Sequence, residues 1–571
     1  MADDSRPSRL LRLALVAICG ASALLLVVLG TRLSFFSDDW YFLLQRPGLS
    51  SHGGIDVLLA PHNGNLVAVD VIIYKGLVGA FGLRSQLPFR LVLASLVVSV
   101  GVLVYLLVSE RLGRMPGVIA ATVVLFLGPA WEDLLFIASI DLIGSLATGL
   151  AALLLLEKDT GRRNPAACGL LVCSVLMSNL GLAFVVAAAV AVALRRRPAQ
   201  LCIPLAPMAL FGVWWIVYGS DASSSVSVAN LVNLPRFILE SIASGLASLT
   251  GLNRGSGTSP YVLGGIVLVL VSVVVGVRWR RGARVSPWIL VFVAAAFTFW
   301  TLTGLSYDRF LERTPSASRY QLIDASLLLV ILAELFRSMR LGAARLAVML
   351  VIAVLVLVSN GDVLGSGYRF MHAQSRYVMA DLGALNIVRA NAPSSQRLVG
   401  PDLFLSGITA GRYFSEAGAH GSPPFYSPVE LAAAPGLQRQ EADNVLIASD
   451  VITTSSDRRR SAGRCQTVQA GSVGDAPEVT LRSGGLLVSN LARRHGEPPA
   501  RVPPQSPPVT LQRLAKQLPS VRMRRFGPIG ASPPLAFVLP GKQVRIAVKR
   551  DSLNLPWHVT LSNGRFELCR E

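Results

Sequence analysis

The sequence predicts a polytopic α-helical membrane protein with about eleven transmembrane helices and a C-terminal extracytoplasmic domain of α/β type or containing a β-sandwich. Of its 571 residues, 52% are hydrophobic and 15% are charged, and the mean hydropathy is +0.54. This much apolar surface does not fit into one water-soluble core. We expect residues 1–360 to form the membrane domain and residues 361–571 to form the C-terminal domain.

Apolar runs long enough to cross a bilayer recur along the first two thirds of the chain. We expect single spans near 11–30, 88–108, 116–130, 140–156, 201–218, 260–277, 288–304, 321–336 and 346–360. Residues 166–194 have arginines at both ends and Ser178 and Asn179 in the middle. This pattern predicts two short helices joined by a tight turn, which brings the count to about eleven.

The net charge of +20 is explained by short basic clusters between the apolar runs and not by nucleic-acid binding, because lysine and arginine collect in cytoplasmic loops. The clusters that this rule places inside are Arg111/Arg114, Lys158/Arg162/Arg163, Arg195–Arg197, Arg278/Arg280/Arg281/Arg284 and Arg337/Arg340/Arg345. We therefore expect a multi-pass plasma-membrane protein with a cytoplasmic N-terminus. An odd number of spans then places the residues after about 361 outside the cytoplasm.

The C-terminal domain reads as an amphipathic helix near 366–391 followed by short strands. The clearest strand signals are Val479–Leu481, Leu486–Val488, Val544–Val548 and His558–Leu561. Two of the six cysteines, Cys465 and Cys569, fall in this domain, and their spacing is compatible with a disulfide or with two free thiols. None of the cysteines has the spacing of a metal site.

The first outer loop, residues 31–87, is longer than two neighbouring helices need, which is typical of a functional loop. Asp38 and Asp39 follow the first apolar run directly. A charge beside hydrocarbon is costly, so such residues are candidates for function. Alternatively, Asp38 caps the next helix and Asp39 pairs with a loop arginine. Residues 67–81 are expected to lie along the membrane surface as an interfacial helix.

These features resemble the GT-C class of integral-membrane glycosyltransferases: an acidic pair after the first span, a long first outer loop, about eleven spans and an extracytoplasmic C-terminal domain. The resemblance covers the whole topology, although its motifs are short. It implies transfer of a sugar from a polyprenyl-phosphate donor to an extracytoplasmic glycan, lipid or protein, expected to proceed with inversion. It also implies that Asp38 or Asp39 is the catalytic base, and Asp38 is favoured slightly.

A second acidic turn, Glu132 and Asp133, lies between the third and fourth expected spans. It is a candidate acceptor site, or a site for a divalent cation such as Mg²⁺, Mn²⁺ or Ca²⁺ together with the first pair. The alternative is a solvated loop charge. Asp141, at the start of the next span, is expected to face the same cavity. His62 and Asn63 are further candidates for binding acceptor hydroxyls.

Arg319 lies at the expected outer end of the tenth span and is the first candidate for binding the donor phosphate, because guanidinium binds phosphate oxygens bidentately. Arg309 is the second candidate, and Tyr320 adds a hydroxyl donor. The run Ser318–Tyr320 resembles a motif at this place in bacterial GT-C-like proteins. The alternative is an interfacial anchor, since arginine and tyrosine are common at membrane boundaries.

Two other classes of function are open on the sequence: a lipid or glycan transporter or flippase, and a non-catalytic membrane scaffold with an outer binding domain. A transporter is expected to contain internal repeats and polar residues at the middle of the membrane. Here the polar clusters concentrate at the expected outer boundary, and no repeat is evident. This placement favours the transferase.

Overall fold

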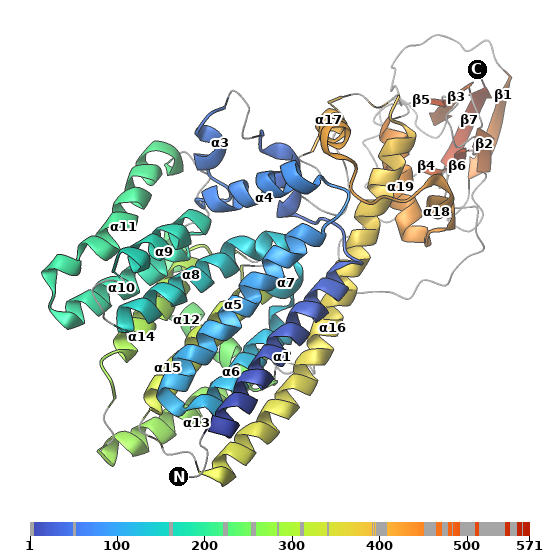
Figure 1. Ribbon diagram of the computed structural model, residues 1–571. Coiled ribbons are helices and arrows are strands. Elements are labelled where there is room, and N and C mark those ends of the chain that lie inside the picture. The colour runs from blue at the N-terminus through green and yellow to red at the C-terminus, as the bar shows by residue number, and fades with distance from the viewer. Residues whose placement is uncertain are drawn as a thin grey trace. The chain divides into compact units, whose positions relative to one another are not determined.

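The structure is a computed structural model (Figure 1). It describes residues 5–48, 53–158, 164–220, 227–252, 259–282, 285–308, 313–337, 339, 342–390, 392, 394–395, 408–449, 464–470, 478–481, 484–490, 509–512, 543–548, 557–561 and 564–570. The described chain is mostly helical, as expected.

Six helices are long and apolar enough to cross a membrane, which agrees with a helical membrane protein. They are α1 (Ser5–Gly30), α5 (Leu87–Leu112), α8 (Ile140–Glu157), α11 (Cys202–Trp214, continued by the π-helix η5, Trp215–Gly219), α13 (Pro260–Arg280) and α16 (Ala343–Ile387). Three shorter helices are also apolar: α9 (Asn164–Met177), α10 (Gly181–Arg195) and α14 (Ile289–Leu305). Helix α6 (Arg114–Leu125) is the first part of a bent span. Helix α15 (Ser318–Leu335) covers the span expected at 321–336, but it contains Arg319, Asp324 and Glu334 and is not among the helices that are apolar enough to cross a membrane. The remaining helix of this part, α12, covers Val228–Leu249.

The two short helices expected within residues 166–194 are confirmed as α9 and α10, with the break at residues 178–180. Serines bind α9 to the preceding α8: the Ser145 and Ser174 hydroxyl oxygens lie 2.9 Å apart, and each hydroxyl also lies within hydrogen-bond distance of the other residue's carbonyl, at 2.9 and 2.8 Å. The two hydroxyl hydrogens are shared among these three contacts. Polar pairs of this kind satisfy buried groups where there is no water.

The span expected at 116–130 is broken. Helix α6 ends at Leu125, and the chain then bends by 43° into η2 (Gly128–Ala130) and α7 (Trp131–Leu135). Gly128 is required at the bend, because any side chain there would overlap the backbone of Asn360. The break therefore comes from close packing against α16, and it presents α7 with its two acidic residues as a separate short helix.

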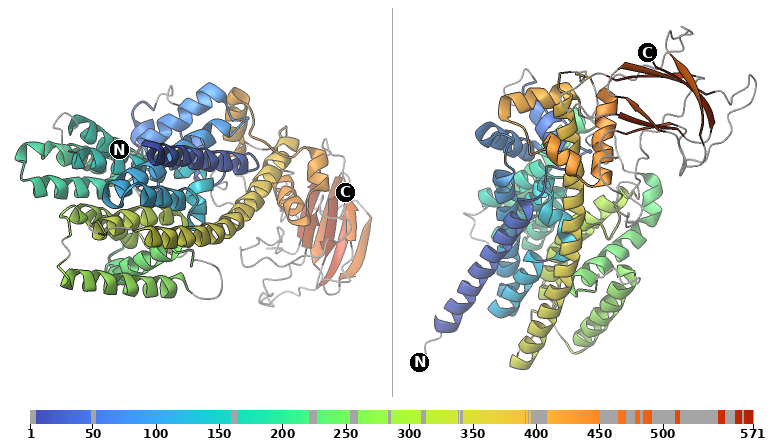
Figure 2. Two further views of the ribbon diagram at one scale, coloured as in Figure 1. Left: turned by 60° about the horizontal axis from the view of Figure 1, so that its bottom comes forward. Right: turned by 90° about the vertical axis from the view of Figure 1, so that its right-hand side faces the viewer.

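The separate elements expected at 346–360 and 366–391 are wrong, because α16 is one continuous helix of 45 residues (Figure 2). At 1.5 Å per residue it is about 68 Å long, roughly twice the thickness of a hydrocarbon core. Polar residues and glycines after 359 suggested a break, but they lie inside the helix. Packing of that segment, such as Trp131 against Phe370 with ring centroids 5.5 Å apart, maintains the helical path.

The chain divides into two compact units, each described here by itself. Unit 1 comprises residues 1–33, 46–81 and 86–371, and unit 2 comprises residues 34–45, 82–85 and 372–571. Unit 1 contains the apolar helices and the short helices α3 (Asp56–Leu59) and α4 (Ala68–Phe81) of the long loop. The helix expected at residues 67–81 is therefore confirmed as α4.

One end of unit 1 gathers the basic residues that the sequence assigns to the cytoplasm, and we call it the basic end. Arg111 at the end of α5 binds Glu157 at the end of α8 and Glu334 at the end of α15. Arg337 binds the same Glu334 at 3.1 Å. Arg195 donates to the carbonyl of Leu156 and stacks on Trp288, while Arg278 stacks on Phe336. Five separate sequence clusters thus include residues that meet at this end (Arg111, Lys158, Arg195, Arg278 and Arg337).

Unit 2 contains α17 (Ala410–His420), α18 (Pro428–Ala433), α19 (Gly436–Ser449) and two antiparallel sheets (Figure 2). The four-stranded sheet has the order β1 (Cys465–Ala470), β7 (Gly564–Arg570), β3 (Gly484–Asn490), β5 (Gln543–Val548), and the three-stranded sheet has the order β2 (Glu478–Leu481), β6 (Trp557–Leu561), β4 (Val509–Gln512). All four strand signals read from the sequence fall in these strands. Cys465 and Cys569 face each other across β1 and β7 and form a disulfide.

Candidate functional site

Asp38 and Asp39 begin the short helix α2 (Asp38–Trp40), which continues as the π-helix η1 (Tyr41–Gln45). The segment is fixed within unit 2 at both ends. The backbone N–H of Ser34 donates to the Ser375 hydroxyl at 2.9 Å, and Arg412 donates to the Gln45 carbonyl at 2.9 Å. Short helical turns that are tied down at both ends hold their side chains in defined positions.

The two aspartates have different local roles. The Asp39 side chain is buried, and its Oδ2 accepts a hydrogen bond of 2.9 Å from the backbone N–H of Phe36. Asp38 is half-buried, and the N-cap position of α2 is occupied by Ser37. Asp39 therefore closes the turn that presents Asp38.

Ser37 has φ 52° and ψ −122°, a region that residues other than glycine rarely adopt. Such backbone outliers cost about 1–3 kcal/mol and cluster at functional sites. Packing next to it offsets this cost: Phe35 and Trp40 are both fully buried, and their rings meet edge to face with centroids 5.9 Å apart. A strained residue directly before Asp38 is the kind of feature that holds a functional side chain in place.

In unit 1, the predicted residues Glu132, Asp133 and Arg319 come together where α7 meets the start of α15. The Ser318 hydroxyl donates to the Pro129 carbonyl at 2.8 Å and accepts from the backbone N–H of Glu132 at 2.9 Å. Arg319 then forms an ion pair with Glu132 at 3.1 Å, with the arginine side chain 32% exposed. The guanidinium is therefore positioned, and part of it stays accessible.

Asp133 is fully buried beside this ion pair. Its Oδ2 lies 3.4 Å from the backbone N–H of Leu322 at the first turn of α15, and it lies within electrostatic range of Glu132, Arg319 and Asp141. Tyr320 packs edge to face on Phe299 with ring centroids 5.9 Å apart. Arg309, the second candidate for the donor phosphate, lies outside the described residues.

His62 and Asn63 belong to a tight hairpin turn in unit 1. Backbone hydrogen bonds of 3.0 and 2.8 Å pair His62 with Asn65. Asn63 and Gly64 both have positive φ, as a two-residue Asn-Gly turn requires. The Gly64 carbonyl accepts from Asn179 at 2.9 Å, so the turn is anchored at the end of α9. Asn63 also lies 3.3 Å from the His62 ring nitrogen.

Asp70 is a candidate that reading the sequence missed. It lies in the first turn of α4, it is 1% exposed, and neither carboxylate oxygen has a hydrogen-bond partner among the described residues. Burial is the larger of two causes that raise the pKa of Asp70 well above its usual value, and the negative charge of Asp141 is the smaller one. The signal in the sequence was a single acid within the apolar run 67–81.

The acidic residues of unit 1 thus lie together at the starts of α4, α7 and α8, and we call this the acidic end. Asp141 lies within electrostatic range of both Asp70 and Asp133. Helices α8 and α15 each begin at the acidic end and finish at the basic end. An 18-residue helix is about 27 Å long, so the two ends are separated by nearly a bilayer core.

One group in the described chain has three side chains close enough to share a metal ion: Cys465, Glu567 and Cys569. The disulfide between the two cysteines leaves no thiolate there, so this group does not fit a metal. No three carboxylates among the described residues converge within ligand distance.

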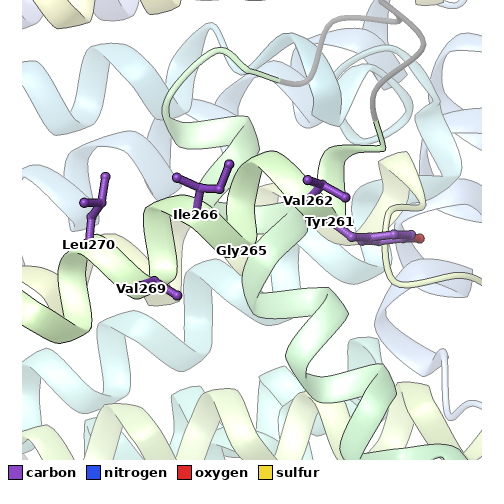
Figure 3. A pocket seen from close by; sticks show the side chains of 6 residues that line it. All are labelled: Tyr261, Val262, Gly265, Ile266, Val269 and Leu270. Atoms are coloured by element: carbon purple, nitrogen blue, oxygen red, sulfur yellow. The ribbon is translucent and has the colours of Figure 1, made fainter.

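An apolar pocket with a volume of about 380 Å³ lies along α13. Its lining residues are Tyr261, Val262, Gly265, Ile266, Val269 and Leu270, and Figure 3 shows the aliphatic side chains spaced along the helix. The Tyr261 hydroxyl bonds to the Ser316 hydroxyl at 2.9 Å, so one end of the pocket reaches the loop before Arg319. The exposed aliphatic side chains suit contact with lipid.

No protein-family model, curated protein or solved structure matches this chain. The described residues define a helical membrane protein with an acidic and a basic end.

Proposed function

We propose that the protein is a membrane glycosyltransferase that moves a sugar from a polyprenyl-phosphate donor to an acceptor of the cell envelope. The observation that carries this proposal is the acidic pair after α1, where Asp39 closes a strained turn and Asp38 is presented half-buried. Such an arrangement suits a general base, which must be ionised and held in reach of the proton that it accepts.

In the proposed reaction, Asp38 takes the proton of an acceptor hydroxyl while the oxygen attacks the anomeric carbon. The new bond to that carbon forms as the bond to the phosphate oxygen breaks, with inversion. The lipid phosphate departs with its electron pair and needs no acid, because it is already a charged, stable leaving group. General-base assistance of this kind is typically worth about 10²–10⁴-fold in rate.

Arg319 is proposed to bind the donor phosphate, since guanidinium remains charged and matches phosphate oxygens. Its ion pair with Glu132 supports this role in one respect, because the carboxylate orients the guanidinium. The monoanionic phosphodiester of the donor would bind the remaining N–H groups, and these would stabilise the second negative charge that develops as the lipid phosphate departs. Tyr320 stays a proposed hydroxyl donor, and Arg309 a proposed second phosphate ligand. The aliphatic pocket on α13 is suited to the lipid tail.

We further propose eleven membrane passes, with a cytoplasmic N-terminus and an extracytoplasmic domain from about residue 361. Two findings support this orientation. The basic residues of five separate clusters meet at one end of unit 1, as a cytoplasmic end requires. The disulfide between Cys465 and Cys569 fits an oxidising compartment. The two sheets of unit 2 are proposed to form the sandwich that binds acceptor.

The test is transfer of radiolabelled sugar from a panel of polyprenyl-phosphate sugars to cell-envelope material from a strain that lacks the protein. We expect Asp38→Asn to lower the transfer rate by about 10²-fold or more. Asp39→Asn is expected to lower it less, since an amide oxygen still accepts the N–H of Phe36. Arg319→Gln is expected to raise the KM for the donor.

Asp56→Asn is the matched control, because Asp56 is an exposed acid of the same loop that bonds to the Tyr218 hydroxyl at 2.8 Å. It should leave transfer unchanged. Full activity in Asp38→Asn, Asp39→Asn and the double variant would exclude the transferase mechanism.

A further inference from the structure

Two serines from other helices bind backbone carbonyls at the break between α6 and α7. Pro129 has no N–H, so it cannot donate to the carbonyl of Leu125 four residues earlier. The buried hydroxyl of Ser22, on α1, donates to that carbonyl at 3.1 Å. The hydroxyl of Ser318, on α15, donates to the Pro129 carbonyl at 2.8 Å. Both serines thus make the same kind of bond, from a hydroxyl to a main-chain oxygen at one break.

Ser318 differs from Ser22 because its bond to the break belongs to a closed loop of contacts. Its oxygen also accepts the backbone N–H of Glu132 at 2.9 Å, and the Glu132 carboxylate is paired with Arg319 at 3.1 Å. Arg319 directly follows Ser318 in the chain. One hydroxyl therefore fixes the backbone of the residue whose carboxylate orients the guanidinium.

Other contacts hold α7 independently of this serine. The Asp133 carboxylate lies 3.4 Å from the backbone N–H of Leu322 on α15, and Arg90 on α5 donates to the Leu135 carbonyl at the end of α7. We therefore expect α7 to keep its place when the serine hydroxyl is removed. The loss is confined to the first turn of α7, which carries Glu132.

We propose that Ser318 is a positioning residue for the donor phosphate site, which holds Glu132, and through it Arg319, in the orientation that receives the phosphate. This inference rests on the proposed function, since it takes the polyprenyl-phosphate donor as the ligand. Without the hydroxyl, the N–H of Glu132 loses its partner and the carboxylate is no longer held in one orientation. A bidentate contact between guanidinium and phosphate depends on orientation, so the loss falls on donor binding and not on the chemical step.

The first test compares Ser318→Ala with Ser22→Ala, which removes the other serine–carbonyl bond of the same break. We expect Ser318→Ala to raise the KM for the donor by about 10-fold, the size of one lost hydrogen bond, with little change in kcat. Ser22→Ala should keep the wild-type KM. Ser318→Thr retains a hydroxyl that donates and accepts, so it should restore the wild-type KM.

A second test uses polyprenyl phosphate without a sugar and separates this proposal from the transferase hypothesis. Radiolabelled polyprenyl phosphate is titrated into the full-length protein in detergent, and the lipid that elutes with the protein is counted. We expect Ser318→Ala to weaken binding by about 10-fold and Ser22→Ala to leave it unchanged. If the wild type binds this lipid and transfers no sugar, the transferase hypothesis fails, and binding alone decides the role of Ser318.

The proposal is overturned if Ser318→Ala binds polyprenyl phosphate as tightly as the wild type, or if the wild type does not bind it. It is also overturned if Ser318→Thr is as weak as Ser318→Ala. An equal loss of affinity in Ser22→Ala would show that both serines act only through the stability of the break. Should Ser318→Ala fail to elute as a single folded species, Ser318→Cys replaces it, because a thiol of similar shape is a weak donor and acceptor.

Discussion

Neighbouring aspartates of this chain differ in role because of their immediate contacts. Asp39 accepts a backbone N–H and is buried, so its carboxylate is part of the turn. Asp38 follows a serine in a left-handed conformation and is half-buried. The sequence offered both residues as the base with a slight preference for Asp38, and the local geometry supports proposing Asp38 as the base and a structural role for Asp39.

The titration of Asp70 leads to a prediction on stability. Its pKa is raised by burial and by Asp141, so the folded chain binds this proton more tightly than the unfolded chain does. The resulting contribution to the free energy of unfolding is fully present below the unfolded pKa of about 3.9 and is lost as pH rises through the folded pKa. Asp70→Asn should therefore raise the melting temperature at neutral pH and leave it unchanged near pH 4.

Thermal unfolding of the full-length protein in detergent, followed across this pH range, measures the effect. Asp56→Asn serves again as the exposed control and should follow the wild type at every pH. A variant Asp70→Asn that is less stable than the wild type at neutral pH would show that the carboxylate has a stabilising partner.

At the scale of elements, α8 and α15 each have a polar group of the acidic end in their first turn and a salt-bridged residue in their last turn. Asp141 and Glu157 mark the two ends of α8, and Arg319 and Glu334 mark those of α15. Arg111 connects the far ends, and its side chain and that of Glu334 are both fully buried. This network fixes the two helices relative to α5, and hence the positions of their first turns.

Removing Arg111 should therefore destabilise the membrane unit. Arg111→Met leaves Glu334 and Glu157 without their shared partner, and breaking a buried ion pair in this way costs about 3–5 kcal/mol. The double variant Arg111→Met/Glu334→Met should recover part of the loss, because no buried charge remains. Chemical unfolding of the purified protein in detergent measures both.

The control is Lys158→Met. Lys158 pairs with Glu110 at 2.8 Å, but both side chains are more than 30% exposed. Exposed ion pairs contribute about 0–1 kcal/mol, so this variant should be nearly neutral. Equal losses in Arg111→Met and Lys158→Met would contradict a special role for the buried network.

On the scale of the whole molecule, the disposition of charge gives a test of orientation. Cys202 is exposed at the start of α11, shortly after the basic cluster that includes Arg195. Cys465 and Cys569 are joined in unit 2. The first variant retains Cys465 and Cys569 as its only cysteines. In intact cells, a membrane-impermeant maleimide should label this variant once the disulfide has been reduced from outside, and should not label it before reduction.

A variant that retains Cys202 alone should be labelled only once the membrane is permeabilised. Mass shift on a gel reads out both variants. The proposed orientation would be reversed if, in intact cells, the maleimide labelled Cys202 and failed to label Cys465 and Cys569 after reduction.

The sequence by itself predicted a helical membrane protein, most of its apolar helices and four of the described strands. Apolar runs, basic flanks and alternating strand residues report local preferences, and these do not depend on distant partners. The break at Ser178 follows from the same local rules. The predictions were wrong where packing against distant segments overrides local preference. Helix α16 continues through the polar stretch after residue 359, and α6 ends at the bend inside the span expected at 116–130.

Only the tertiary structure decided which polar residues meet. It paired Arg319 with Glu132, joined Cys465 to Cys569 and brought Asp70 beside Asp141. The two residues of each pair are far apart in the chain. The free energy of each interaction depends on how deeply the residues are buried and on the distance between them in the folded protein. Neither quantity is encoded in a local pattern, because the energy of a charge depends on what surrounds it after folding.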